Sequence, residues 1–375
     1  MMGETGITKF DKGDENIDVE VTVAIRPEIA LGDYAKLVPA YKTPKITAAV
    51  VKERVDELAM QQAELVTIEE DRALESGDTV LMDFEGSIDG GIKTFFLSVM
   101  AKIKSEDTTR KTIRETIEEG FNLLGGFGNL RSPVLVKPNL CTIKDGTGYS
   151  VTDTEVVKTI VDLLLETDSK LSIKIIESDS QSKNAEEAFV KFGYTKFCQG
   201  QQDSGFDVTT VELSRLPLSQ ISFDGEYFKD PELPDILTSP HYFISVAVAK
   251  THGLSYITGV LKNLFGVLPR KDMSVYHKQI HEIITDLARI LRPELNIVDA
   301  RVGVEDWNGP KTHRIGAFIL GRQPVSVDAT MTRIFDLDPL NVGHLVKSRK
   351  HNLGVLDPLV IGESIEDASV KFSPP

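Results

Sequence analysis

The sequence predicts an α/β fold in which a mostly parallel sheet is flanked by helices, preceded by a small α+β segment at the N-terminus. From residue 92 onward, short runs rich in valine and isoleucine alternate with amphipathic stretches of helical period. Such alternation is typical of parallel strands joined by helices. The runs are apolar throughout, which is the pattern of strands buried on both faces.

Charge divides the 375 residues into two predicted domains, residues 1–91 and residues 92–375. The first holds 20 of the 57 acidic residues but only 9 of the 42 basic ones. A net charge of −15 argues against a nucleic-acid partner, which requires a basic surface. The central apolar run, residues 242–249, is too short to span a bilayer, and the N-terminus does not resemble a signal peptide. We therefore expect a cytoplasmic protein with no membrane partner.

The first domain is predicted to contain two strands and a helix. Residues 17–24 alternate like a strand, and residues 46–65 place apolar side chains on one helical face. Residues 79–91 read as a strand that runs into an Asp-Gly hairpin turn.

Two motifs in this domain, "RPEIALGDY" and "GDTVLMDFEGSIDG", resemble the start of the peptidyl-prolyl isomerase domain of bacterial trigger factor, over about residues 17–91. The resemblance implies an FKBP-type fold and puts Phe84 at a position where that family carries a pocket aromatic. The family's ribosome-binding domain and the second half of the isomerase domain have no counterpart in these residues. We therefore expect a truncated segment, which leaves a strand edge to be covered.

Seven strands are predicted in the second domain from apolar, β-branched runs bounded by turn residues. They cover residues 92–104, 133–138, 171–178, 206–213, 241–250, 294–300 and 315–321.

Six helices are predicted between and after these strands. They lie within residues 105–120, 152–168, 184–194, 256–266, 278–293 and 324–337. Ser105 is the predicted N-cap of the first helix and Gly120 lies just past its end. The glycine-rich segment 122–130 follows a helix and precedes a strand, the wrong order for a dinucleotide-binding loop, so it predicts a turn.

Polar side chains follow four of the predicted strands, at the edge where ligands bind in parallel sheets. They are Lys137, Asn139, Glu177, Lys250, His252, Asp299 and Glu305. No packing requirement explains polar groups at four strand ends, so we expect them to line one crevice.

The lysines of this set, together with Lys262 and Asn263 in "GVLKNLFG", predict a site for an anionic small molecule. Fixed positive charges favour a carboxylate or a phosphate. The alternative is that the lysine stems merely cover apolar surface. His252 and Lys250 are the candidate catalytic residues, because an unperturbed imidazole titrates near neutral pH. The alternative for His252 is a core histidine bonded to backbone.

A weaker pattern suggests a metal site. His277 and His281 are four residues apart and share a face if a helix starts by Tyr276. Acids at the strand ends would then add oxygen ligands. The two cysteines, Cys141 and Cys198, are too few and too far apart in sequence to bind an iron–sulfur cluster within this chain. No sequence pattern indicates which cofactor, if any, the chain binds. Asp328 is predicted to be a helix cap.

Several motifs, in order, resemble the domain of unknown function 362 family over about residues 94–365. They are "VLVKPNLC", "AKTHGL", "GVLKNLFGVLP", "DLARILRPELNIVDA" and "PVSVDA". Members occur alone or attached to ferredoxin-like domains, which implies an iron–sulfur redox partner. Whether the chain is an enzyme stays open. One hypothesis is an enzyme of redox or carboxylate metabolism, such as a racemase or isomerase. The alternative is a folding helper, a prolyl-isomerase-related fusion protein that binds polypeptide clients.

Overall fold

The computed structural model describes residues 6–12, 17–22, 87–88, 91–92, 97–103, 110–145, 147–269 and 272–375. The chain divides into two compact units, residues 1–83 and residues 84–375. In the first unit, β1 (Gly6–Lys12) pairs antiparallel with β2 (Ile17–Thr22), which confirms the strand predicted there. The helix predicted at residues 46–65, and Phe84, lie outside the described residues.

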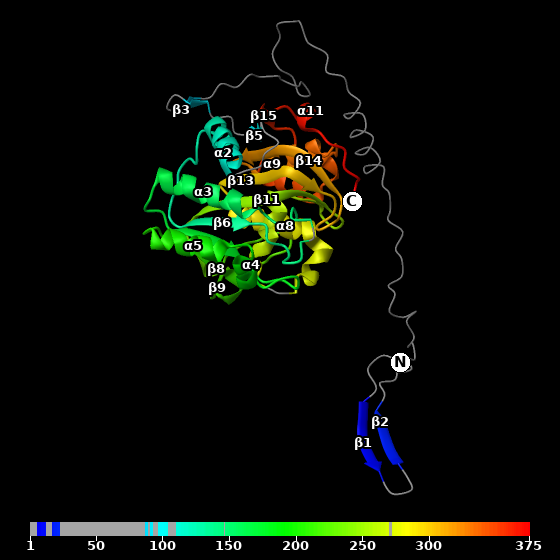
Figure 1. The fold of residues 1–375 in the computed structure, drawn as a ribbon. Helices are drawn as coiled ribbons and strands as arrows, with labels where there is room; N and C mark the ends of the chain where they lie inside the picture. The colour runs from blue at the N-terminus through cyan, green and yellow to red at the C-terminus, as the bar shows by residue number, and fades with distance from the viewer. Residues whose placement is uncertain are drawn as a thin grey trace, which may run out of the picture. The chain divides into compact units, whose positions relative to one another are not determined.

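The second unit is built on a nine-stranded sheet (Figure 1). Its strands are β5 (Leu97–Lys102), β6 (Val134–Pro138), β7 (Ile173–Glu177), β8 (Val208–Glu212), β11 (Tyr242–His252), β12 (Tyr256–Thr258), β13 (Leu295–Val304), β14 (Thr312–Gly321) and β15 (Leu359–Gly362). The order is β15-β5-β14-β13-β11-β6-β7-β8, with β12 beside β11. Neighbours from β13 to β8 are parallel, whereas β14 is antiparallel to both of its neighbours. The predicted mostly parallel α/β fold is confirmed.

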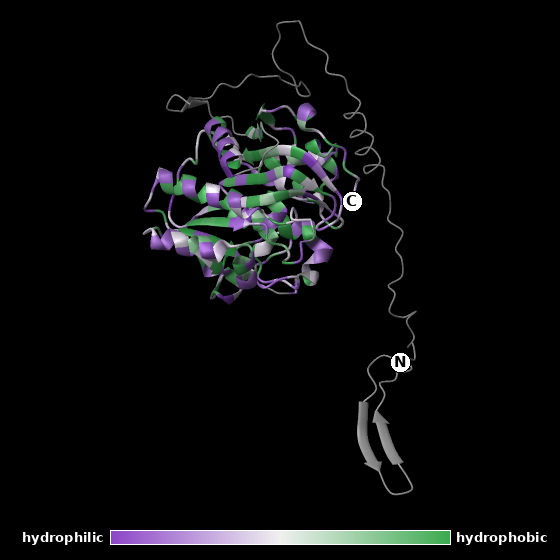
Figure 2. Cartoon of the chain, viewed as in Figure 1, coloured by the Kyte–Doolittle hydropathy of each residue, from purple (hydrophilic) through white to green (hydrophobic). Residues whose placement is uncertain are grey.

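Helices cover both faces of the sheet and enclose two apolar cores. One core contains residues of α2 (Arg110–Leu124), α3 (Thr154–Thr167), α4 (Ala185–Lys191) and α5 (Tyr194–Asp203). The other contains residues of α7 (Val260–Asn263), α8 (Ile280–Leu291), α9 (Pro324–Ile334), α10 (Gly343–Ser348) and α11 (Ile365–Ala368). The central strands are mostly hydrophobic, while the outer helices carry hydrophilic stretches (Figure 2). β11 is buried from Tyr242 to Thr251 because both cores pack against it.

Smaller elements complete the second unit. β9 (Leu218–Gln220) and β10 (Glu232–Pro234) form a two-stranded sheet, and so do β3 (Ser87–Ile88) and β4 (Gly91–Ile92). The remaining elements are α6 (Asp235–Thr238) and the 3-10 helices η2 (Leu213–Arg215), η3 (Leu264–Val267), η4 (Met273–Gln279), η5 (Pro339–Asn341) and η6 (Arg349–His351).

One predicted helix end was wrong. Helix α2 passes through Gly120 and ends at Leu124. A Cβ at Gly120 would lie 2.7 Å from Leu320 of β14, so glycine there allows the helix to approach the sheet. The turn predicted after the helix is confirmed, with Gly125 and Gly126 at positive φ. Ser105 lies outside the described residues.

The segment between β11 and α8 also differs from the prediction. Residues 256–258 form β12 rather than the start of a helix, because β11 continues to His252 and pairs with β12 through Lys250. The helical part is reduced to α7 and the 3-10 turn η3. Helix α5 was not predicted at all; it buries only Tyr194 and Cys198 and therefore has a weak apolar pattern.

Candidate functional site

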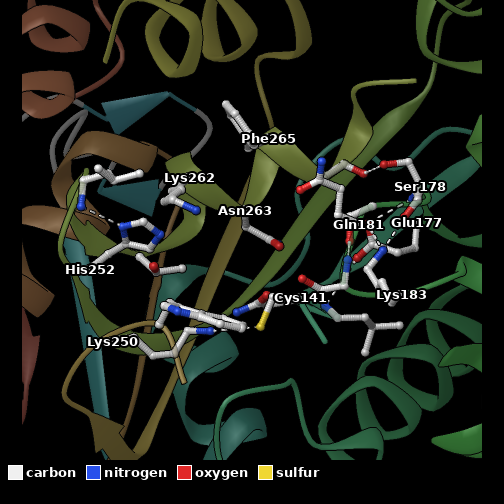
Figure 3. A pocket seen from close by; sticks show the side chains of 18 of the residues that line it. Cys141, Glu177, Ser178, Gln181, Lys183, Lys250, His252, Lys262, Asn263 and Phe265 are labelled. Carbon is white, nitrogen blue, oxygen red and sulfur yellow. Dashed lines mark hydrogen bonds and ion pairs between the residues drawn. The ribbon is translucent and has the colours of Figure 1, made fainter. Parts of the chain in front are cut away.

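A cavity of about 610 Å³ lies at the carboxyl ends of β6, β7 and β11 (Figure 3). Eight of the predicted site residues line it: Lys137, Asn139, Glu177, Lys250, His252, Lys262, Asn263 and His277. They come from three neighbouring strands and from the segment after β12, as expected where parallel strands end together. The size is that of a small-molecule site.

On one side of the cavity, a buried carboxylate pairs with two lysines. The Glu177 carboxylate accepts a hydrogen bond from Lys137 Nζ at 2.5 Å and lies 3.4 Å from Lys183 Nζ. Burial lowers the pKa of Lys137, and the nearby Glu177 carboxylate opposes that shift. A Cβ at Gly266 would lie 2.8 Å from both Lys137 Nζ and Glu177 Oε1, so only glycine lets η3 approach this pair without displacement. Glu177 is therefore held between cations and is not a free base.

The other side carries positive charge without a carboxylate partner among the described residues. Lys250 Nζ donates to Ser150 O at 2.7 Å and lies 3.4 Å from Cys141 Sγ. Lys262 Nζ lies 5.5 Å from the centroid of the Phe265 ring. Burial, followed by the charge of Lys250, lowers the pKa of Lys262 to about 8. Two cations with no acid between them repel each other, and an anion in the cavity would relieve that repulsion.

Backbone hydrogen bonds and burial favour the neutral form of His252, and its role as a general acid–base stays a prediction. Its Nδ1 accepts from the backbone N–H groups of Leu254 at 3.1 Å and Ser255 at 3.4 Å, which puts the ring proton on Nε2. Burial, then the charges of Lys262 and Lys250, lower the pKa of His252 to about 2. Figure 3 shows the ring next to Lys262 in the cavity.

Two polar atoms in the cavity wall are buried without a hydrogen-bond partner in the described structure. They are the side-chain nitrogen of Asn139 and the hydroxyl of Thr258. A buried unpaired polar group costs about 1–3 kcal/mol, so a ligand or water is expected to satisfy these atoms. Asn263 differs, because its Nδ2 donates to Lys137 O at 2.9 Å and to Ser245 Oγ at 3.1 Å. Asn263 therefore links β6 and β11 beneath the cavity.

Asp328 lies within α9 but caps the N-terminus of a different helix, α7. Its carboxylate accepts from Val260 N at 2.7 Å and Leu261 N at 3.0 Å, the first residues of α7. Burial raises the pKa of Asp328 to about 7, and the two backbone hydrogen bonds oppose that shift. A Cβ at Gly259 would lie 2.0 Å from Asp328 Oδ1. Asp328 thereby holds the short helix that carries Lys262.

Two predicted site residues lie elsewhere. Asp299 lines a second cavity and pairs with Arg301 at 2.7 Å; it sits inside β13, which runs four residues past the predicted end at residue 300. Glu305 is in the β13–β14 hairpin and pairs with Lys311 and His313. Burial raises the pKa of Glu305, but hydrogen bonds from Lys311 and the backbone of Ser373 outweigh burial and lower that pKa to about 2. The expectation of one crevice is wrong for these two acids.

The predicted metal pair is separated by a change of helix type. His277 lies in η4 and lines the cavity, whereas α8 begins at Ile280, so the premise of one helix from Tyr276 is wrong. The His281 ring stacks on His344 with ring centroids 5.5 Å apart. Among the described residues, no group of three or more His, Cys, Asp or Glu side chains is arranged to hold a metal ion.

Sequence reasoning missed several residues of the cavity wall. They include Cys141, Lys183 and Trp307, whereas the sequence indicates Asp306, which also lines the cavity, only as a polar residue after the strand predicted to end at residue 300. Cys141 and Lys183 follow β6 and β7 by a few residues, so extending the strand-end rule into the loops would have found them. Asp306 reaches the cavity because its backbone N–H donates to the Thr251 hydroxyl at 2.8 Å, a contact that no local pattern indicates.

The fold and the cavity define an α/β protein with a cation-rich pocket at the carboxyl ends of parallel strands. The chain belongs to the family described as Domain of unknown function (DUF362), whose model matches residues 134–333. This match contains β6, β7, β11 and α7, and therefore the strand ends that form the pocket. The resemblance predicted from the motifs is confirmed.

The N-terminal region is similar to trigger factors. It is 46% identical over 90 residues to the trigger factor of Sulfurimonas denitrificans and 44% identical over 90 residues to that of Sulfurovum sp.. The trigger factor of Campylobacter jejuni is 40% identical over 89 residues. The matches cover 24% of this chain and about a fifth of the length of each relative. Within the described residues, no helix has the length and apolarity to cross a membrane.

Proposed function

We propose that the cavity binds a small carboxylate or phosphate and that the chain is an enzyme acting on it. The observation that carries the proposal is the pair of cations, Lys250 and Lys262, which line one cavity and form no ion pair with a described carboxylate. Leaving two such charges uncompensated costs free energy that a bound anion returns.

Three further groups support an oxygen-rich ligand. The Nε2–H of His252 and the side-chain nitrogen of Asn139 are donors without a described partner, and Thr258 adds an unpaired hydroxyl. Donors that converge on one cavity suit the oxygens of a carboxylate or phosphate, which only accept hydrogen bonds.

The charged side chains are also distributed unevenly between the two sides of the cavity. One side holds Lys250 and Lys262, which form no described ion pair, together with His252, and the other side holds Glu177, which pairs with Lys137 and Lys183 and offsets part of their charge (Figure 3). We infer that the anionic group of the ligand lies at the first side and a neutral, hydrogen-bonding part at the second.

Calorimetric titration of the full chain with pyruvate, lactate, succinate and inorganic phosphate tests the proposal. At least one should bind, and Lys262→Met should weaken that binding by roughly tenfold or more, the scale of one charge-assisted hydrogen bond. Lys158→Met is the matched control, because Lys158 lies on α3 outside the cavity and pairs with Glu155. If no anion of the panel binds, or if both variants weaken binding equally, the proposal fails.

A second candidate is a folding helper, favoured by the N-terminal similarity to trigger factors. A prolyl-isomerase assay on the full chain separates the two: we expect only the background rate, and a rate above background would reverse the ranking. The iron–sulfur redox partner implied by the family resemblance stays a prediction, which co-purification with a ferredoxin would test.

A further inference from the structure

Lys262 stands in the setting that makes a lysine amine nucleophilic. Its Nζ lines the cavity, its closest described partner is the Phe265 ring at 5.5 Å, and no described carboxylate pairs with it. A desolvated lysine next to a second cation keeps part of its amine neutral near physiological pH. The other lysines of the wall differ: Lys137 and Lys183 pair with Glu177, and Lys250 donates to a backbone carbonyl.

We propose that Lys262 forms an imine with the carbonyl carbon of a 2-oxo acid bound in this cavity. The inference rests on the proposed anion site and names its ligand class. The lone pair of the neutral amine forms a bond to the carbonyl carbon, and the two amine protons leave with the carbonyl oxygen as one water molecule. No oxidant, reductant or further reactant is required.

The neighbouring groups fit the two ends of such a ligand. Lys250 supplies a fixed cation for the carboxylate, and the Nε2–H of His252, next to Lys262 in Figure 3, is a neutral donor for the carbonyl oxygen. A neutral donor polarises a carbonyl without adding a third charge beside the two lysines. The Phe265 ring, 5.5 Å from Nζ, makes a cation–π contact that favours the charged amine, and burial together with the charge of Lys250 outweighs it.

Titratable groups from several elements act on Lys262, and Glu177, His277 and Asp306 line the same cavity. Lys250 and His252 belong to β11, Cys141 to the loop after β6, and His344 to α10. Asp328 of α9 caps the N-terminus of α7. Burial and Lys250 lower the pKa of Lys262 to about 8, so the neutral amine becomes the major form above that pH.

Borohydride trapping of the full chain with pyruvate tests the inference. Peptide mass spectrometry should place the reduced adduct on Lys262. Lys262→Arg, which keeps the charge but forms no imine, should remove the adduct, and Lys158→Arg should retain it. At pyruvate concentrations that saturate the site at every pH, trapping in the unmodified chain should rise roughly tenfold from pH 7 to pH 9 and then level off, whereas an ordinary lysine rises roughly a hundredfold and continues.

Lactate, which has no carbonyl group, separates the two proposals. If pyruvate and lactate both bind but the adduct is absent from Lys262, the imine is overturned and the anion site stands. If neither binds, the imine is overturned as well, and titration with the other anions decides the anion site. If the adduct spreads over surface lysines with no preference for Lys262, the inference fails, and this readout does not depend on any variant folding.

Discussion

At the scale of single residues, the cavity combines two opposite solutions to burying a lysine. Lys137 is paired with Glu177, while Lys250 and Lys262 have no described acid partner. A lysine paired with a buried carboxylate stabilises the fold only as part of the pair, whereas an unpaired one is available to a ligand. The same residue type therefore plays a structural role on one side of the cavity and a proposed binding role on the other.

The pH dependence of anion binding should report Lys262. Its pKa is lowered to about 8, so it is charged below that pH and loses its charge as the pH rises through it. We therefore expect the affinity for anions that form no imine, such as lactate, to be highest below pH 8 and to fall between pH 8 and pH 9.5. Lys262→Met should bind weakly at every pH and lack this step. Calorimetric titration across the range measures it, and an unchanged step in the variant would assign the titration to another group.

Lys250→Met and Lys137→Met should give opposite patterns. The Lys250 ammonium donates a hydrogen bond to the Ser150 carbonyl and has no described acid partner. Lys250→Met should therefore weaken anion binding by about 1.5–3 kcal/mol and lower the free energy of unfolding by at most about 1.5 kcal/mol. Lys137→Met leaves Glu177 buried with a weaker partner and should destabilise the fold by about 3–5 kcal/mol. Denaturant melts and ligand titration measure both. A large stability loss for Lys250→Met with unchanged binding would contradict the proposed anchor.

At the scale of elements, the site depends on a short helix, α7, that is not stable without contacts from other elements. Helix α7 has four residues, too few for stability of its own, and it carries Lys262 and Asn263. It is fixed from outside: Asp328 of α9 accepts its first N–H groups, and Val260 O accepts from Ser245 of β11. The position of Lys262 is thus set by two longer elements.

Asp328→Ala should therefore affect both stability and binding. It removes two buried hydrogen bonds from α7, and we expect a loss of about 1–3 kcal/mol in the free energy of unfolding together with weaker anion binding. The control is Asp338→Ala, an exposed cap that accepts from Leu340 N and should cost about 0.5–1 kcal/mol without affecting binding. Equal losses from both variants would show that Asp328 is an ordinary cap.

At the scale of the whole molecule, the second unit has its own two apolar cores on the two faces of one sheet. All the residues of these cores lie between Val99 and Phe372. The described part of residues 84–375 thus contains what a domain needs to fold, while the trigger-factor-like similarity covers only the N-terminal region.

Deletion of residues 1–91, the predicted first domain, should leave a chain that unfolds cooperatively. We expect its denaturation midpoint to match that of the full chain, because the core residues are retained, and anion binding to persist. Circular dichroism melts and the same titration measure this. Aggregation or loss of a cooperative transition would show that the first domain is integral to the second.

The sequence alone predicted most of the long strands and helices of the second unit, because local apolar period and turn residues define them, but it missed α5 and β12. It also determined that Lys137, Glu177, Lys250 and His252 stand at strand ends, since parallel neighbours place such ends at one edge. Only the tertiary structure decided which partners these side chains have. Asp299 pairs with Arg301 and Glu305 pairs with Lys311, so neither acid lines the cavity. The charge state of His252 depends on Lys262, and the placement of α7 depends on Asp328, 68 residues away from Val260 along the chain. Burial and electrostatic coupling act through space between residues far apart in sequence, and no local pattern contains that information.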